Sequence, residues 1–158
     1  MITTETQQDI ADGEEIIRTF SDLLRAGGTL SDVLSKEASK ENEAMYCVGY
    51  SLYEKGSYLD AFKVFSVLVM RNQQELRYVS GLAGACQMLG RYPDALQHYM
   101  TAATLNMDDP KPIFHAAECL VAMSHIEQAK ESLKLVLEIV PDPQVPLHGR
   151  AQTLLQKL

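Results

Sequence analysis

The residues of this chain that could support metal or thiol chemistry gather on one short stretch. His115, Glu118 and Cys119 follow one another closely, and on a helix His115 and Cys119 would stand at i and i+4, a spacing that can bind a metal ion. No second pair of ligands completes such a site, and Cys119 lies in an apolar run that should face the core. No loop or helix N-terminus is placed to activate the thiol. We therefore expect no metal site, no cofactor and no enzymatic activity.

The other thiols lead to the same conclusion. The chain has three cysteines, Cys47, Cys86 and Cys119, and none belongs to a Cys-x-x-Cys pair. An odd count without such a pair is typical neither of a disulfide framework nor of a zinc finger. Each cysteine falls in an apolar helical stretch, so we expect all three to be reduced, buried and engaged only in packing.

These residues belong to a repeat that dictates where each of them lies. Gly56, Gly90 and Ser124 stand 34 residues apart, and three further slots return in the same register. Those slots are Tyr58, Tyr92 and Ile126; Ala61, Ala95 and Ala129; Phe65, Tyr99 and Leu133. A period of this length is typical of the tetratricopeptide repeat, a helix–turn–helix unit that stacks into a solenoid. The small alanine slot marks where two helices cross, and the larger slot fills the space between repeats.

The repeat divides the chain into three parts. Residues 1–41 form an N-terminal helical arm, residues 42–141 hold three repeats, and residues 142–158 form a capping helix. The predicted fold is all-α, a right-handed solenoid of helical hairpins. Repeats begin near residues 42, 76 and 110, and the cap presents apolar residues to the exposed end of the stack. These are Leu147, Ala151, Leu154, Leu155 and Leu158.

The arm carries an apolar stripe that needs a partner. A helix over residues 7–26 would end at Gly27-Gly28, and Thr29 or Ser31 could begin a short second helix. The stripe could fold onto the first repeat or meet the same arm of a second molecule. Its residues, our candidates for a dimer interface, are Ile16, Ile17, Phe20, Leu23 and Leu24.

A row of tyrosines marks the first helix of repeat one. Tyr46, Tyr50 and Tyr53 stand at i, i+4 and i+7, on one face, beside a core side formed by Val48, Gly49 and Leu52. First helices line the concave surface of such a solenoid, so we expect the tyrosines to face a groove. Tyrosines offer rigid apolar area with a polar tip, a combination enriched at binding surfaces. The alternative is that some of them are core residues whose hydroxyls reach solvent.

The same stripe continues through the other two repeats. In repeat two it consists of small and polar residues, and in repeat three Phe114 would supply a second aromatic anchor. Gly84 favours the close approach of another backbone, or else Gly81 and Gly84 only allow tight helix packing. The candidate groove residues beyond the tyrosines are Arg77, Ser80, Gly84, Gln87, Lys111, Phe114 and Glu118. A groove with aromatic walls and few charges suits an extended peptide that inserts apolar side chains.

Composition limits the partners. The net charge of −7 argues against nucleic acid, which requires clustered Lys and Arg. No run approaches the ~18 apolar residues of a membrane span, so we expect no membrane insertion. The first residues are acidic and carry no basic residue, unlike a signal peptide. These features predict a cytoplasmic protein.

Taken in order, four motifs resemble the class II chaperones of bacterial type III secretion systems, which hold hydrophobic translocator proteins before export. The resemblance spans about residues 16 to 140, and one departure from it is the segment Pro141-Asp142-Pro143-Gln144-Val145-Pro146. The motifs are Gly27-Gly28-Thr29-Leu30, Asp60-Ala61-Phe62-Lys63-Val64-Phe65 after Tyr58, Gly81-Leu82-Ala83-Gly84-Ala85-Cys86, and Phe114-His115-Ala116-Ala117-Glu118-Cys119-Leu120.

The resemblance implies a cytoplasmic bacterial chaperone without enzymatic activity. It implies that a short extended segment of each translocator lies in the concave groove and that the N-terminal helix can mediate a homodimer. The groove residues it implies are Tyr46, Tyr50, Tyr53, Ser80, Gly84 and Phe114. An alternative function is that of a general tetratricopeptide adaptor joining soluble proteins.

Overall fold

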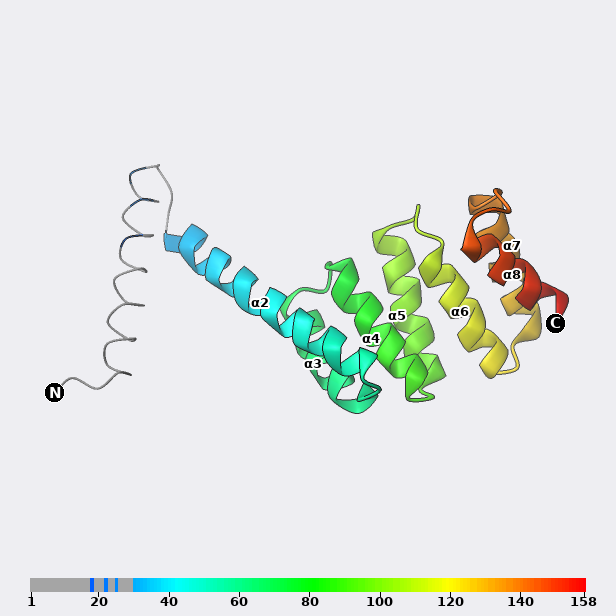
Figure 1. Ribbon diagram of the computed structural model, residues 1–158, viewed down its shortest axis with the longest axis horizontal. Helices are drawn as coiled ribbons and strands as arrows, with labels where there is room; N and C mark the ends of the chain where they lie inside the picture. The colour runs from blue at the N-terminus through cyan, green and yellow to red at the C-terminus, as the bar shows by residue number, and fades with distance from the viewer. Residues whose placement is uncertain (1–17, 19–21, 23–24, 26–29) are drawn as a thin grey trace. The chain divides into compact units, whose positions relative to one another are not determined.

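The computed structural model describes residues 30–158 and, before them, Arg18, Asp22 and Arg25. This described part contains seven helices and no strand, which confirms the all-α prediction (Figure 1). In chain order the helices are α2 (Leu30–Glu54), α3 (Tyr58–Arg71), α4 (Leu76–Met88), α5 (Tyr92–Leu105), α6 (Lys111–Ala122), α7 (Ile126–Ile139) and α8 (Pro146–Gln156).

Two compact units, Met1–Ala44 and Met45–Leu158, make up the chain. In the first unit, Arg25 Nη1 lies 3.2 Å from Asp22 Oδ1 on an exposed helical turn. The predicted dimer residues of the arm lie outside the described residues. The short second helix expected to begin at Thr29 or Ser31 is wrong in length, because α2 is one continuous helix of 25 residues. No proline interrupts its sequence, and its one glycine, Gly49, is buried within the helix.

The three repeat turns share one backbone geometry. Gly56, Gly90 and Ser124 have φ angles of 79°, 72° and 63°, the left-handed region. The following N–H in each turn bonds back five residues, as from His125 to the Leu120 carbonyl at 2.8 Å. This is the Schellman pattern, which satisfies carbonyls at a helix end. Ser124 therefore replaces glycine without changing the turn.

One detail of the first turn differs from the usual cap of a helix. Ser57 occupies the N-cap position of α3, but its side chain makes no capping hydrogen bond. Asp60 instead pairs with Lys63, whose Nζ lies 2.8 Å from Asp60 Oδ1. The turn is thus held by its backbone hydrogen bonds, and the side chains of the first helical turn pair with each other.

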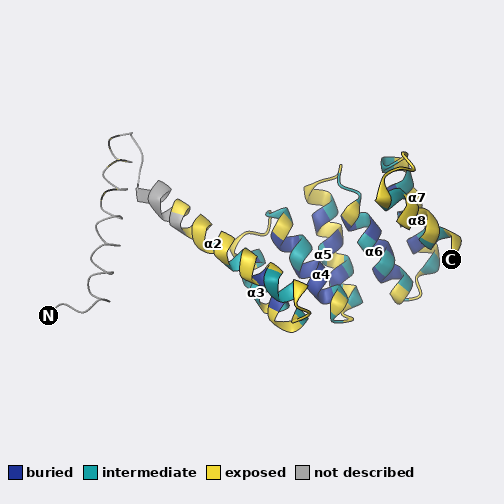
Figure 2. Cartoon of the chain, viewed as in Figure 1, coloured by how far each residue is buried: buried dark blue, intermediate teal, exposed yellow. Residues whose placement is uncertain are grey.

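The recurring slots form the core of the second unit. Ala61, Ala95 and Ala129 are completely buried, as expected where two helices cross. Figure 2 shows buried residues gathered along α4, α5 and α6. The larger slot is buried as well, at Phe65, Tyr99 and Leu133. Successive helices pack side by side from α3 to α8, so each repeat covers the apolar face of the one before it.

The last helix closes this stack. Ala151 of α8 is completely buried against a cluster that contains Phe114, Leu133 and Val136. Further apolar residues of the C-terminal segment pack around this cluster, in agreement with the inward face expected from the sequence. They are Leu147, Leu154, Leu155 and Leu158.

Two expectations for α2 are wrong. Cys86 and Cys119 are buried, but Cys47 is exposed. Val48, assigned to the core side, is 53% exposed. The neighbouring Gly49 is buried instead, and a Cβ added to it would lie 3.1 Å from the Phe65 ring. Gly49 therefore faces α3, and Cys47 and Val48 are turned away from it.

Candidate peptide-binding groove

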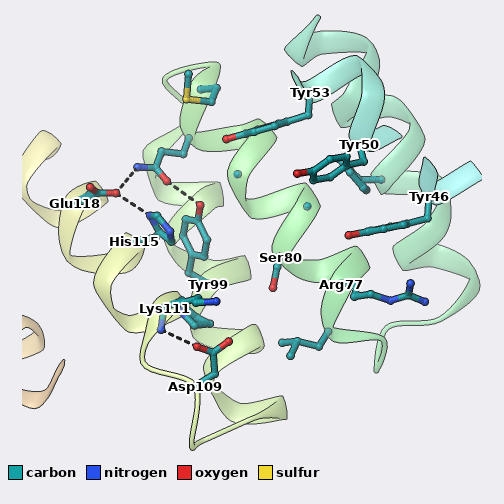
Figure 3. A pocket seen from close by; sticks show the side chains of 17 residues that line it. Tyr46, Tyr50, Tyr53, Arg77, Ser80, Tyr99, Asp109, Lys111, His115 and Glu118 are labelled. Carbon is teal, nitrogen blue, oxygen red and sulfur yellow. Dashed lines mark hydrogen bonds and ion pairs between the residues drawn. The ribbon is translucent and has the colours of Figure 1, made fainter. Parts of the chain in front are cut away.

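A pocket of about 530 Å³ opens between the first helices of the three repeats. Side chains from α2, α4 and α6 converge on it, with the tyrosines on one side and α6 on the other (Figure 3). We call this pocket the groove. Nine of the residues expected from the sequence line it: Tyr46, Tyr50, Tyr53, Arg77, Ser80, Gly84, Gln87, Lys111 and Glu118.

The tyrosine wall is both packed and accessible. Tyr46 lies with its ring centroid 6.4 Å from that of Tyr50 and 6.0 Å from that of Phe65, and Arg77 covers it at 4.8 Å. Tyr53 packs edge-on against Tyr58 at 5.4 Å. Tyr50 is the outermost of the three and is 53% exposed. The tyrosines were expected either to face a groove or to belong to the core. They do both, because rings that pack on the core also form one wall of the groove.

The two α4 glycines have different roles. A Cβ on Gly81 would lie 2.6 Å from the Phe65 ring, so this glycine permits α3 and α4 to pack closely. A Cβ on Gly84 would lie 3.4 Å from the Tyr53 ring, an ordinary contact. Gly84 therefore serves no packing need that alanine could not meet, and its missing side chain deepens the groove under Tyr53.

Phe114 is not a groove residue. It is 2% exposed, packs in the core cluster of α6, α7 and α8, and carries the Arg150 guanidinium 4.5 Å above its ring. His115 lines the groove in its place. Lys111, His115 and Glu118 stand at i, i+4 and i+7, as the three tyrosines do, but Lys111, Phe114 and Glu118 at i, i+3 and i+7 share one helical face equally well.

Seven more residues line the groove without having been expected from the sequence. Some are buried residues whose edges reach the pocket, and others lie at its ends. They are Phe65, Leu76, Gly81, Met88, Tyr99, Asp109 and Pro112. The regular spacing of a first helix could not identify Phe65, Tyr99 or Asp109, because Phe65 and Tyr99 belong to second helices and Asp109 precedes α6; the other four lie on α4 and α6, next to predicted groove residues.

A chain of hydrogen bonds forms the polar end of the groove. Tyr99 Oη donates to Gln87 Oε1 at 2.8 Å, and Gln87 Nε2 donates to Glu118 Oε2 at 3.1 Å. His115 Nδ1 lies 2.8 Å from the same Glu118 oxygen. Arg150 Nη2 of α8 is 3.5 Å from Glu118 Oε1. The network joins α4, α5, α6 and α8, so it fixes the positions of the groove side chains.

Comparison with known proteins agrees with this architecture. The tetratricopeptide repeat family model matches residues 88–158. Low calcium response locus protein H of Yersinia pestis is 32% identical over 136 residues, which cover 86% of this chain and 80% of the relative. The type III secretion translocator chaperone SycD of Yersinia enterocolitica, solved as an alternative dimer, superposes with a TM-score of 0.71. It is 29% identical, over 75% of this chain and 91% of SycD.

The chain belongs to the class II translocator chaperones of type III secretion systems. PcrH of Pseudomonas aeruginosa, solved in complex with the chaperone binding region of PopD, is similar to it with a TM-score of 0.71 and 30% identity. This match covers 75% of the present chain and 91% of PcrH. The repeat architecture and the family therefore agree.

The electrostatics of the groove in this chaperone set the protonation of Tyr99 and of Glu118. Burial raises the pKa of Tyr99 far above its ordinary value, so its hydroxyl remains a donor. Burial alone would raise the pKa of Glu118 too, but hydrogen bonds from His115 and Gln87 and the charges of His115 and Arg150 lower it below the usual range. Glu118 is therefore an anion that accepts hydrogen bonds from both neighbours.

The metal and thiol sites considered from the sequence can be compared with the structure. In residues 30–158 with Arg18, Asp22 and Arg25, no three His, Cys, Asp or Glu side chains gather as a metal ion would require. Burial raises the pKa of the Cys119 thiol to about 11, so it is not a thiolate at neutral pH. None of the helices in the same part of the chain has the length and apolar character needed to traverse a bilayer.

Proposed function

We propose that this chaperone binds hydrophobic translocator proteins in the cytoplasm of a secreting bacterium and keeps them soluble and apart before export. An extended segment of the translocator lies in the groove, with apolar side chains against the tyrosine wall. The chaperone catalyses no reaction. Binding alone accounts for its action, because covering an apolar segment removes the surface through which translocators would aggregate.

The groove itself is the observation that carries this proposal. Its volume of about 530 Å³ suits several side chains and exceeds what one side chain would fill. Its wall combines apolar ring faces with hydroxyl groups, which suits a peptide whose backbone also needs hydrogen-bond partners. The PopD region bound to PcrH shows that a relative of similar fold holds a translocator segment.

Co-expression with a hydrophobic translocator tests the proposal. We expect the translocator to become soluble and to co-purify with the wild-type chaperone but much less with Tyr50→Ala. Leu59→Ala is the matched control, because Leu59 is 57% exposed against 53% for Tyr50 and does not line the groove. Equal recovery of the translocator with both variants would contradict the groove assignment. Clients that are soluble without the chaperone would favour a general adaptor.

We also propose that the N-terminal arm, residues 1–41, supports a homodimer. The SycD structure described above is a dimer, and the apolar stripe of the arm, with Phe20 and Leu23, needs a covering surface. Sedimentation of the full chain should show a dimer that Phe20→Glu with Leu23→Glu converts to a monomer. An unchanged sedimentation coefficient in that variant would exclude the arm as the interface.

A further inference from the structure

The polar end of the groove contains two groups whose hydrogen-bonding roles are fixed by the protein. Because the Tyr99 hydroxyl donates to Gln87 Oε1, the Gln87 amide must turn its Nε2 toward Glu118. Nε2 has two hydrogens and makes one hydrogen bond within the described part of the chain. Gln87 thus keeps one donor for a ligand, in a groove that it lines.

The neutral form of His115 has the complementary role. Glu118 is ionised, so it accepts from His115 Nδ1, and Nδ1 must carry the proton. In the neutral imidazole the remaining nitrogen, Nε2, then carries the lone pair and is an acceptor. The ring is held in place because it stacks on Tyr99 at 5.3 Å and meets Phe114 edge-on. About a third of the side chain, 34%, is exposed to solvent in the groove.

The two groups lie close together because both side chains bind the same oxygen, Glu118 Oε2. Figure 3 shows His115, Tyr99 and Glu118 gathered on the α5 and α6 side of the groove, opposite the tyrosines of α2. A donor beside an acceptor matches what an extended polypeptide presents, since each residue has one C=O and one N–H. Side chains of an apolar client segment offer no such pair.

On the basis of the chaperone function inferred above, we propose that Gln87 and His115 bind the main chain of the translocator segment. Gln87 Nε2 donates to a backbone carbonyl of the client, and His115 Nε2 accepts a backbone N–H. Glu118 and Tyr99 position these two side chains, and Arg150 extends the support from α8. This end of the groove therefore recognises a peptide of any sequence in extended form, and the tyrosine wall supplies the preference for apolar side chains.

Ester substitution of single backbone amides tests this inference. The probe is a synthetic peptide of the PopD chaperone binding region, in which each N–H in turn is replaced by an ester oxygen. With the wild-type chaperone, calorimetry should find one position where the ester lowers the affinity about ten-fold, the effect of leaving a buried group unpaired. In His115→Phe, which keeps the aromatic ring, the same ester should cause no further loss.

Two variants complete the test. His115→Gln, whose amide can donate to Glu118 and accept from the client, should restore both the affinity and the sensitivity to the ester. His125→Phe, a change outside the groove, should leave both as in the wild type. The inference is overturned if His115→Phe binds the unmodified peptide as tightly as the wild type, or if every ester costs the same in both proteins. Tyr50→Ala separates this inference from the proposal that the groove binds the client. If Tyr50→Ala loses binding while His115→Phe does not, the groove proposal stands and the main-chain inference fails.

Discussion

Adding one methyl group to α4 distinguishes a glycine needed for packing from a glycine needed for the groove. At Gly84 the new Cβ would lie 3.4 Å from the Tyr53 ring, a contact that requires no movement of the protein. Alanine exceeds glycine in helix propensity by ~1 kcal/mol. Gly84→Ala should therefore raise the free energy of unfolding by up to about 1 kcal/mol, which corresponds to a rise in Tm of roughly 4 °C.

The same methyl group should weaken binding. It would occupy groove space under Tyr53 that a client side chain or backbone would otherwise fill. Overfilling a closely packed site costs about 1–3 kcal/mol, so we expect the affinity for the PopD peptide to fall by roughly ten-fold or more. Fluorescence anisotropy with a labelled peptide measures this loss, and thermal unfolding followed by circular dichroism measures the gain in stability.

Gly81→Ala is the matched control on the same helix. Its Cβ would lie 2.6 Å from the ring of Phe65, which is 2% exposed and has little room to move. The overpacking cost of about 1–3 kcal/mol exceeds the gain in propensity, so this variant should be less stable than the wild type. Our assignment of the two glycines is refuted if Gly84→Ala destabilises the fold as much as Gly81→Ala, or if it binds the peptide like the wild type.

Four further outcomes are expected. Ser124→Gly should raise the free energy of unfolding by ~1 kcal/mol, because glycine adopts the left-handed φ of 63° without strain; an unchanged denaturation midpoint would argue against strain at this turn. Phe114→Ala should lower the free energy of unfolding by about 3–5 kcal/mol in chemical denaturation, as for a core residue. A variant that loses peptide binding but keeps its stability would instead show that Phe114 is a groove residue. Glu118→Gln should cost roughly 1–2 kcal/mol at pH 7. Because the folded pKa of Glu118 is lowered, this difference should be complete above about pH 4.5 and shrink as the pH falls through the folded value; a constant difference would exclude the ionised network. Cys47 should react with a maleimide in the native protein and Cys119 only after unfolding, as mass spectrometry of the labelled peptides would show; equal labelling would contradict the burial of Cys119.

The register of the repeat made much of the second unit predictable from the sequence. A small residue is required where two helices cross closely, so the recurring slot of Ala61, Ala95 and Ala129 could be predicted to be buried, as it is. Glycine or its substitute is required where the chain turns with positive φ, which located the turns at Gly90 and Ser124. These constraints are local and repeated, so each one supported the others.

The candidate site was less predictable on α6. Successive helical residues differ by about 100° in direction, and the sequence alone allowed either Phe114 or His115 to face the groove. Phe114 is drawn into the core because Ala151 of α8 completes a cluster around it and Arg150 covers its ring. That packing depends on how α8 returns after the proline-rich segment 141–146, and no local pattern encodes such a return.

Site-specific photo-crosslinking during co-expression with a translocator tests most directly whether the groove holds the client. A benzophenone amino acid at Tyr50 should crosslink to the translocator, and the crosslinked peptide should map to one short segment of it. The same probe at Met100 should not crosslink, although Met100 is 54% exposed against 53% for Tyr50, because it does not line the groove. Crosslinking at Met100 without crosslinking at Tyr50 would contradict binding in the groove.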